Sequence, residues 1–485
     1  MNHVVVIGNG ISGITAARTV RKLNADVRIT VISAETDYFF SRTALMYIYM
    51  GHMTFEDTQP YQKWFWPQNR IDLVRGYVQA IDTEARTLHL GDGQTIGYDR
   101  LVLGLGSSYN LFGWPGQDLH GVQGLISKPD LDEMERNTRG IDHAVVVGGG
   151  LIGIEMAEML HSRHVHTTFL VREKTYMPKA LPAEEGMMIV RHVKDHGIDL
   201  RMATEFEAIL GDDAGRVRAV RLKDSGEEVA CQFVGLTVGV HPNIDILKDT
   251  PIETGRGVMV DEHMQTSVPG VYAVGDCAQY RVPPPGRQPI EPLWYTGRMH
   301  GEVAGRHICG VPAPYTPGLF FNSAKFFDIE YQVYGPIATK PIDGIDSLYW
   351  EHENGLHAIR IDYNADDHTV RGFNLMGTRY RQNVCFEWIQ NGAEMPYVLE
   401  NLGQANFDPE FYKQHEKEVV AVYNRKHPNR AVTLRRRRSL FKNPFAYIAR
   451  LRGEAGRTQE TGDSLPAKNV DVTPGSDKPG SGSTA

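Results

Sequence analysis

The stretches VVVIGNGISG, residues 4–13, and VVVGGGLIG, residues 145–153, decide the fold of this chain. In both, a run of apolar residues ends in the pattern G-x-G-x-x-G, formed by Gly8, Gly10 and Gly13 and again by Gly148, Gly150 and Gly153. The first glycine permits a tight strand-to-helix turn, the second lets backbone approach a pyrophosphate, and the third lets helix pack on strand. The anion then lies at the helix N-terminus, where free N–H groups and the helix dipole favour negative charge. The chain is therefore predicted to hold two dinucleotides.

The composition is that of an ordinary soluble globular protein, and the length is sufficient for a multi-domain enzyme. The chain has 485 residues, 41% of them hydrophobic and 23% charged, which suits two to four domains. No apolar run is long enough to span a membrane and no signal peptide is visible, so a cytoplasmic protein is predicted. The four cysteines lie far apart, which disfavours a disulfide framework or a zinc site. No metal site is predicted.

Charge is unevenly distributed along the chain. The segment RRRRSLFKNPFAYIARLR, residues 435–452, holds seven basic residues and no acidic one. Since the net charge of the whole chain is −8, the rest of the chain carries about −15. Apolar residues recur there at helical spacing, which indicates peripheral contact with the inner face of a membrane or with an acidic partner; a solvated segment is the alternative. Nucleic-acid binding is disfavoured because no recognition module is present. Residues 453–485, rich in Gly, Ser, Pro and Thr, are predicted to be a disordered tail.

The order of strands and helices predicts an α/β fold in which one dinucleotide-binding domain is inserted in another. The first domain takes residues 1–115 and 250–317, and the inserted domain takes 116–249. Residues 318–430 are predicted to form a C-terminal α+β domain, followed by the basic segment 431–452. Glu35 follows the second strand, where a carboxylate can accept both ribose hydroxyls of an adenosine.

With these motifs in order, the chain resembles the pyridine nucleotide-disulfide oxidoreductase superfamily, the flavoproteins with two dinucleotide folds. The run TSVPGVYAVGDCAQ, residues 266–279, resembles its second flavin-binding signature, and LVLGLGSS and LTVGVHPN resemble its crossover strands. The resemblance implies FAD in the first fold and NADH or NADPH in the second. It assigns to FAD the residues Gly8, Gly10, Ile11, Ser12, Gly13, Glu35, Arg42, Gly106, Gly275, Asp276 and Trp294.

The same resemblance assigns the nicotinamide nucleotide to a second set of residues. Glu155, in GGGLIGIE, is expected to point toward the nicotinamide. At the end of the following strand, Arg172 would favour the 2′-phosphate of NADPH and Glu173 would favour the 2′-hydroxyl of NADH. Arg172 comes first, which gives a slight lean toward tolerance of NADPH. The set is Gly148, Gly150, Leu151, Ile152, Gly153, Glu155, Arg172 and Gly239.

The segment YFFSRTALMY, residues 38–47, separates the branches of this superfamily. Disulfide reductases place redox cysteines near here, whereas this chain has Ser41 and Arg42 and no cysteine within reach. Thiol-disulfide exchange needs a thiolate, so that chemistry is disfavoured and no catalytic side chain is assigned. The segment instead resembles the branch of ferredoxin reductases, rubredoxin reductases, nitrite reductase and apoptosis-inducing factor, in which the basic residue lies beside the flavin.

These features predict an FAD-dependent NAD(P)H oxidoreductase that passes electrons to an iron-sulfur protein, a quinone or a small molecule. The alternative is a flavin-bearing redox sensor or assembly protein with slow turnover. A homodimer through residues 318–430 is implied by the resemblance alone.

Overall fold

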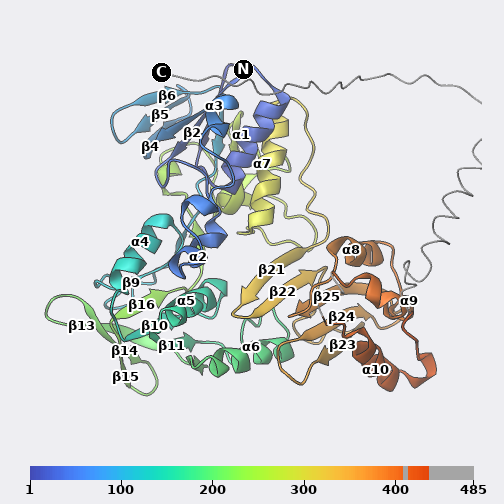
Figure 1. Ribbon diagram of the computed structural model, residues 1–485. Coiled ribbons are helices and arrows are strands. Elements are labelled where there is room, and N and C mark those ends of the chain that lie inside the picture. The colour runs from blue at the N-terminus through green and yellow to red at the C-terminus, as the bar shows by residue number, and fades with distance from the viewer. Residues whose placement is uncertain (408–412, 436–485) are drawn as a thin grey trace, which may run out of the picture. The chain divides into compact units, whose positions relative to one another are not determined.

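A computed structural model describes residues 1–407 and 413–435 (Figure 1). The basic segment 435–452, apart from Arg435, and the predicted tail 453–485 lie outside these residues. The fold is of the predicted α/β class, with two parallel sheets and a C-terminal α+β part. Within the described residues no helix has the length and apolar character needed to cross a membrane.

The first parallel sheet has the strand order β19-β7-β1-β2-β3. Val4 to Val6 of β1 are fully buried, in a core that also contains apolar residues of α1 (Ile11–Leu23) and of the meander of β4 (Val78–Asp82) and β5 (Thr87–Leu90). In the register of β1, Val5 pairs with Thr30 on one side and Leu101 on the other. The strands are β1 (His3–Ile7), β2 (Arg28–Ser33), β3 (Ile71–Arg75), β7 (Arg100–Leu103) and β19 (Val271–Ala273). Because β19 pairs with β7 across about 170 residues of chain, the first domain consists of two separated segments.

Two long helices of this domain, α1 (Ile11–Leu23) and α7 (Trp294–Ile308), run side by side (Figure 1). Glycines on α7 let the two backbones approach closely. A Cβ at Gly301 would lie 2.2 Å from the carbonyl oxygen of Ser12, and one at Gly305 would lie 3.0 Å from that of Ala16. This packing brings the N-termini of the two helices to the same end of the sheet.

Shorter elements complete the first domain. An antiparallel meander and a parallel strand pair flank the sheet: β4 (Val78–Asp82), β5 (Thr87–Leu90), β6 (Thr95–Gly97), β18 (Val258–Val260) and β20 (Ala278–Tyr280). The short helices are η1 (Arg42–Ala44), α2 (Leu45–Tyr49), η2 (Glu56–Thr58), α3 (Phe65–Gln68), η3 (Asp245–Leu247) and η4 (Gly275–Cys277).

The inserted segment repeats this plan with the strand order β12-β11-β10-β16-β9. Its sheet strands are β9 (Val122–Gln123), β10 (His143–Val147), β11 (His166–Val171), β12 (Asp199–Met202) and β16 (Phe233–Leu236). Its helices are α4 (Lys128–Asn137), α5 (Leu151–Ser162) and α6 (Ala183–Asp195), and its meander is β13 (Phe206–Gly211), β14 (Val217–Leu222) and β15 (Glu228–Ala230). The chain enters and leaves this segment through an antiparallel pair, β8 (Ser107–Tyr109) and β17 (Val240–Pro242).

The C-terminal part is an antiparallel sheet with helices, in the strand order β21-β22-β25-β24-β23. The strands are β21 (Phe321–Phe326), β22 (Ile329–Tyr334), β23 (Ile345–Glu351), β24 (Ala358–Asn364) and β25 (Val370–Met376). The helices are α8 (Gln382–Gln390), α9 (Met395–Asn401), η5 (Leu402–Gln404), α10 (Glu416–Lys426) and η6 (Pro428–Arg430). The N-cap of α8 is Arg381. The exact domain boundaries stay predictions.

Candidate dinucleotide sites

The first glycine loop has the geometry that a bound pyrophosphate requires. Gly8 has φ +101°, and a Cβ there would lie 2.1 Å from the carbonyl oxygen of Gly104. A Cβ at Gly13 would lie 2.1 Å from the carbonyl oxygen of Gly8, whereas one at Gly10 would meet nothing within 4 Å. The first and third glycines are therefore fixed by packing. The second faces open space, where a ligand can approach the backbone.

The second glycine loop repeats these relations. Gly148 has φ +114° and lies against the carbonyl of Thr237, and a Cβ at Gly153 would lie 2.1 Å from the oxygen of Gly148. A Cβ at Gly150 would again meet nothing within 4 Å. Two residues that the motif does not reveal support the loop. Thr237 donates to the carbonyls of Val147 at 2.7 Å and Gly148 at 3.1 Å, and buried Tyr176 donates to that of Gly150 at 3.1 Å.

The two helices that begin at these loops, and α7 beside the first loop, have no side-chain cap. The N-caps of α1, α5 and α7 are Gly10, Gly150 and Leu293, and none of them accepts a backbone N–H through its side chain. By contrast, Ser127 forms a complete capping box on α4. The first N–H groups of a helix need an acceptor. Other helices, such as α6 and α8, also have no side-chain cap, so the termini of α1 and α5 are suited to bind anionic groups because each also begins at a glycine that faces open space.

Glu35 and Arg42, both assigned to FAD, form an ion pair with each other. The Arg42 guanidinium lies 2.9 Å from one Glu35 carboxylate oxygen and 2.5 Å from the other, and it also donates to the carbonyl of Ile126. The backbone N–H of Lys128 donates to Glu35 at 2.9 Å. A pocket of about 470 Å³ opens beside Glu35, with Tyr38 in its lining. A carboxylate offers about four acceptor positions, so Glu35 keeps capacity for one ribose hydroxyl in this arrangement.

Asp276 lies where the predicted flavin signature places it, against the first crossover strand. Its carboxylate accepts a hydrogen bond from Ser107 at 3.0 Å. Burial raises the pKa of Asp276, while the Ser107 hydrogen bond and the nearby Arg42 guanidinium lower it. Gly275 has φ +75° and packs against the side chain of Ser12. The structure thus brings together the first glycine loop and the GD motif, which are more than 260 residues apart.

A buried histidine that the sequence analysis missed holds this motif. His300 of α7 is 1% exposed, and its Nδ1 accepts the backbone N–H of Gly275 at 3.2 Å. Because Nδ1 is an acceptor, Nε2 carries the proton and donates to Tyr280, 2.6 Å away. The Tyr280 hydroxyl in turn donates to Glu291 at 3.4 Å. Burial lowers the pKa of His300 to about 3, so the ring is neutral.

The two crossover strands are tied to each other beside Asp276. Asn243 donates its backbone N–H to the carbonyl of Gly106 at 3.0 Å and its amide to that of Leu105 at 3.1 Å. The backbone N–H of Asn110 donates to the carbonyl of Gly239 at 3.0 Å. Gly106 and Gly239 have φ +68° and +92°, so both predicted glycines occupy turns that favour glycine. Leu105, next to Gly106, is partly buried and packs against the first core.

Trp294 is the first residue of α7. Its ring is half-buried and lies edge-on to the ring of Tyr295, with centroids 5.4 Å apart. A Cβ placed on Gly297, in the first turn of α7, would lie 3.6 Å from the Cα of Gly275. The backbone N–H groups at the start of this helix therefore lie near the Gly275 turn. This end of α7 can therefore present donors to the region of Asp276, as the resemblance implies.

Glu155 lies on α5, one turn after the second glycine loop. No hydrogen bond or ion pair to its carboxylate is formed by the residues that the structure describes. Burial, with a smaller contribution from Glu158, raises the pKa of Glu155 to about 7. Glu158 instead pairs with Lys325 at 2.9 Å. Glu155 is therefore a carboxyl group that changes charge near neutral pH at the second site.

Arg172 and Glu173 follow the end of β11 and form an exposed ion pair of 3.2 Å with each other. The two dinucleotide folds can be aligned through equivalent hydrogen bonds, Gly8 N–H to the carbonyl of Ile32 and Gly148 N–H to that of Leu170. In this register Glu173 corresponds to Glu35. The alignment therefore places a carboxylate, and not Arg172, at the position equivalent to Glu35.

None of the four cysteines is arranged for thiol chemistry. All are unpaired, and Cys277, beside Asp276, is fully buried and donates to the carbonyls of Leu103 and Val274. Burial raises the pKa of Cys277 to about 11. A buried thiol of high pKa is a poor nucleophile.

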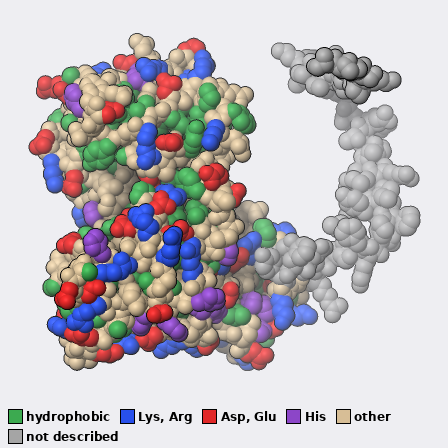
Figure 2. All heavy atoms as spheres, turned by 60° about the vertical axis from the view of Figure 1, so that its left-hand side comes forward, with side chains coloured by type: hydrophobic (Ala, Val, Ile, Leu, Met, Phe, Trp, Pro, Cys, Tyr) green, Lys and Arg blue, Asp and Glu red, His purple; other side chains and the backbone are tan. Residues whose placement is uncertain are grey.

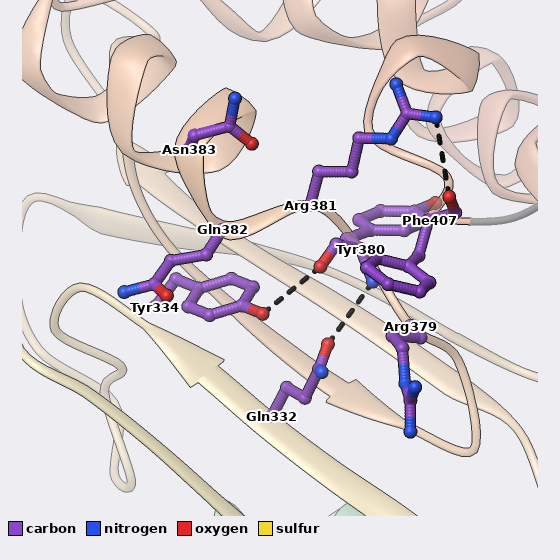
Figure 3. A pocket seen from close by; sticks show the side chains of 8 residues that line it. All are labelled: Gln332, Tyr334, Arg379, Tyr380, Arg381, Gln382, Asn383 and Phe407. Atoms are coloured by element: carbon purple, nitrogen blue, oxygen red, sulfur yellow. Dashed lines mark hydrogen bonds between the residues drawn. The ribbon is translucent and has the colours of Figure 1, made fainter. Parts of the chain in front are cut away.

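Another pocket, of about 560 Å³, lies on the C-terminal part (Figure 3). Figure 3 shows Tyr334 donating to the carbonyl of Tyr380, Tyr380 N–H donating to Gln332, and Arg381 donating to the carbonyl of Phe407. It is lined by none of the residues assigned to the dinucleotides. On the face drawn in Figure 2, acidic and basic side chains are intermingled, which gives no single-sign patch there.

Comparison with known proteins agrees with this geometry. The pattern of the pyridine nucleotide-disulphide oxidoreductases matches residues 2–301. The chain belongs to this family. Its members bind FAD and use NAD(P)H, so the predicted family and cofactors are confirmed.

Relatives in this family differ in length and acceptor. The chain is 29% identical to a nitrite reductase [NAD(P)H] of Bacillus subtilis over 72% of the chain but only 43% of that protein. It is 28% identical to a ferredoxin–NAD(P)(+) reductase of Sphingomonas sp. over 76% of the chain and 88% of that protein. The fold also resembles an NAD-dependent persulfide reductase of A. fulgidus, with a TM-score of 0.76, 22% identity and coverage of 88% and 83% of the two chains.

The two glycine loops fit the two nucleotides of the family. Open space at Gly10 and Gly150, the uncapped N-termini of α1 and α5, and the pocket beside Glu35 are the features that an FAD and a nicotinamide nucleotide would use. The assignment of individual residues to each nucleotide stays a prediction.

Proposed function

We propose that this chain is an FAD-dependent NAD(P)H oxidoreductase that delivers electrons to a separate acceptor. The observation that carries the proposal is the pair of equivalent glycine loops, each open at its second glycine and each leading into an uncapped helix. When bound, FAD accepts a hydride from the nicotinamide and releases the electrons to an acceptor. The protein supplies orientation and electrostatics.

In the first site, the backbone of α1 would hold the pyrophosphate, and Glu35 the adenosine ribose. Binding requires Arg42 to release at least one of its two contacts with Glu35, because the ribose hydroxyls need those oxygens. Arg42 lies close enough to Asp276 to lower its pKa, so we place the guanidinium within electrostatic reach of the flavin side of the site. Asp276 would accept the ribityl hydroxyls, held in place by Ser107 and by His300 acting through Gly275.

In the second site, the backbone of α5 would hold the nicotinamide nucleotide. Glu173, in the register of Glu35, supports a preference for NADH, because a carboxylate pairs with a ribose 2′-hydroxyl and repels a 2′-phosphate. This reverses the slight lean toward NADPH that Arg172 alone suggested. The ion pair between the two side chains leaves Arg172 partly neutralised.

The acceptor we favour is a small iron-sulfur protein. The buried state of Cys277 disfavours a disulfide acceptor on this chain, and a relative aligned over 88% of its length is a ferredoxin reductase. A quinone is the alternative if the basic segment 435–452 brings the protein to a membrane surface. Peripheral membrane contact is a further proposal, which co-sedimentation with vesicles would test. A homodimer through residues 318–430 is another, which light scattering would test.

Stopped-flow mixing of the holoenzyme with NADH or NADPH under anaerobic conditions tests the proposal. The expected result is rapid loss of the oxidised flavin absorbance, faster with NADH, followed by rapid reoxidation when ferredoxin is added. Glu173→Gln should bring the NADPH rate closer to the NADH rate. Gly150→Ala adds a methyl group to the second site alone and should slow reduction without loss of FAD. Slow reduction by both nucleotides and no response to any acceptor would favour the redox sensor instead.

A further inference from the structure

Three metal-ligating side chains converge at the C-terminal end of α6. His192 and His196 are four residues apart and therefore lie on one face of the helix. Asp328 comes from the turn between β21 and β22. Its Oδ2 lies 3.0 Å from Nε2 of His196 and 3.8 Å from Nε2 of His192. One nitrogen or oxygen of each residue lies within 4.8 Å of the other two.

The hydrogen bond of His196 determines which of its nitrogens is free. Nδ1 lies 2.9 Å from the backbone carbonyl of His192. A carbonyl oxygen only accepts, so Nδ1 carries the proton and Nε2 offers a lone pair to the Asp328 side. A carboxylate oxygen also only accepts. A positive charge, either a proton or a metal cation, is therefore needed between His196 and Asp328.

His192 distinguishes these two possibilities. Its side chain is 6% exposed, and its Nε2 is buried with no hydrogen-bond partner among the described residues. A proton shared by His196 and Asp328 leaves this nitrogen unpaired, which is costly for a buried polar atom. One cation between the three side chains satisfies all of them.

The surroundings also suit a cation. Zinc bonds of 2.0–2.2 Å place neighbouring ligand atoms roughly 3.3 Å apart, between the two distances observed here. The last carbonyls of α6 carry partial negative charge, which attracts a cation. Asp328 is 72% exposed, so solvent can reach the position and supply the remaining ligand. The nearby cation Lys325 is already paired with Glu158.

The turn that carries Asp328 is held against the helix. Phe327 has φ +53°, which is uncommon for a bulky residue, and it is 3% exposed. Its ring packs 4.6 Å from the ring of His196, centroid to centroid. Phe327 thus anchors the turn beside His196, with Asp328 within reach of both histidines.

We propose that His192, His196 and Asp328 bind one divalent cation of the zinc class. Two imidazoles and a carboxylate are ligands typical of zinc and the later first-row metals. Near its N-terminal end α6 is already fastened to β24 by the bidentate ion pair between Glu185 and Arg360. The cation fastens the other end of α6 to the β21–β22 turn. It therefore links the second dinucleotide domain to the C-terminal part.

Equilibrium dialysis of the tag-free holoenzyme against micromolar Zn²⁺, followed by metal analysis, tests this proposal. The expected result is one zinc per chain, with a rise in the thermal unfolding midpoint. Asp328→Asn, at an exposed turn, and His196→Gln should each weaken zinc binding at least about tenfold and abolish that rise.

His166→Gln is the matched control, because His166 is an exposed histidine of the same domain outside the cluster. It should bind zinc as the wild type does. The proposal is wrong if the wild type binds no zinc, which would indicate an imidazolium paired with Asp328. It is equally wrong if Asp328→Asn and His196→Gln bind zinc unchanged, or if His166→Gln loses it.

Discussion

His300 is expected to make the stability of the folded chain fall as the pH is lowered. The ring is neutral in the fold because burial lowers its pKa from 6.5 to about 3. Protonation would also place a second N–H against the backbone N–H of Gly275. A lowered histidine pKa means that the unfolded state binds the proton first. The contribution of neutral His300 to the stability of the fold is therefore complete above pH 6.5 and is lost progressively between pH 6.5 and 3.

The size of this effect follows from the two pKa values. Between about pH 7.5 and about pH 5 the unfolded chain takes up nearly one proton at this position and the folded chain takes up almost none. The free energy of unfolding should fall by about 2 kcal/mol from this residue alone. The side chain is fully buried, so solvent screening reduces this figure little.

Urea unfolding of the holoenzyme at both pH values, with FAD in excess, measures the effect. His300→Gln removes the titration, and its free energy of unfolding should fall by about 2 kcal/mol less than that of the wild type over the same range. His89→Gln, a change at an exposed position in β5, should behave as the wild type. An equally steep fall in His300→Gln would refute the reasoning. Coincident transitions by fluorescence and circular dichroism are required for the comparison.

Three further predictions concern the dinucleotide sites. As apoprotein, Gly10→Ala should keep the wild-type unfolding midpoint, but it should lose FAD on gel filtration. Gly13→Ala should lower the free energy of unfolding of the apoprotein by about 3 kcal/mol, because a Cβ at Gly13, unlike one at Gly10, meets backbone; equal effects of the two changes on folding would contradict this. Glu155 should ionise near pH 7, so NAD⁺ should bind more tightly at pH 8 than at pH 6 by titration, and Glu155→Gln should remove that dependence. Cys277→Ala should retain steady-state turnover of NADH with ferricyanide, and loss of turnover would revive a thiol mechanism.

The glycine loops were predictable because their requirement is local. Gly8 and Gly148 need a positive φ and contact with backbone, which no other residue type satisfies as well, so the sequence pattern reports the geometry directly. The insertion of one domain in the other was predictable for a related reason. The second flavin-binding signature, residues 266–279, follows the inserted segment, and β19 within it pairs with β7 of the first sheet.

The partners of charged and polar side chains could not be predicted. Arg42 was expected to lie beside the flavin, but its guanidinium donates hydrogen bonds to Glu35. The fold of residues 34–45 determines which groups this side chain can reach. His300 meets Gly275 only through the packing of α7 on α1. Asp328 and the histidines of α6 belong to separate domains. Such sites depend on long-range packing, which the spacing along the chain does not record.

An anaerobic titration of the holoenzyme with NADH tests the central claim most directly. A chain with one FAD and no redox-active thiols takes up two electrons, so the flavin absorbance should be lost completely at one equivalent of NADH per FAD. A requirement for two equivalents would reveal a second two-electron centre, such as a cysteine pair, and would contradict the account. Purification without FAD, or no loss of absorbance with excess NADH, would contradict it as well.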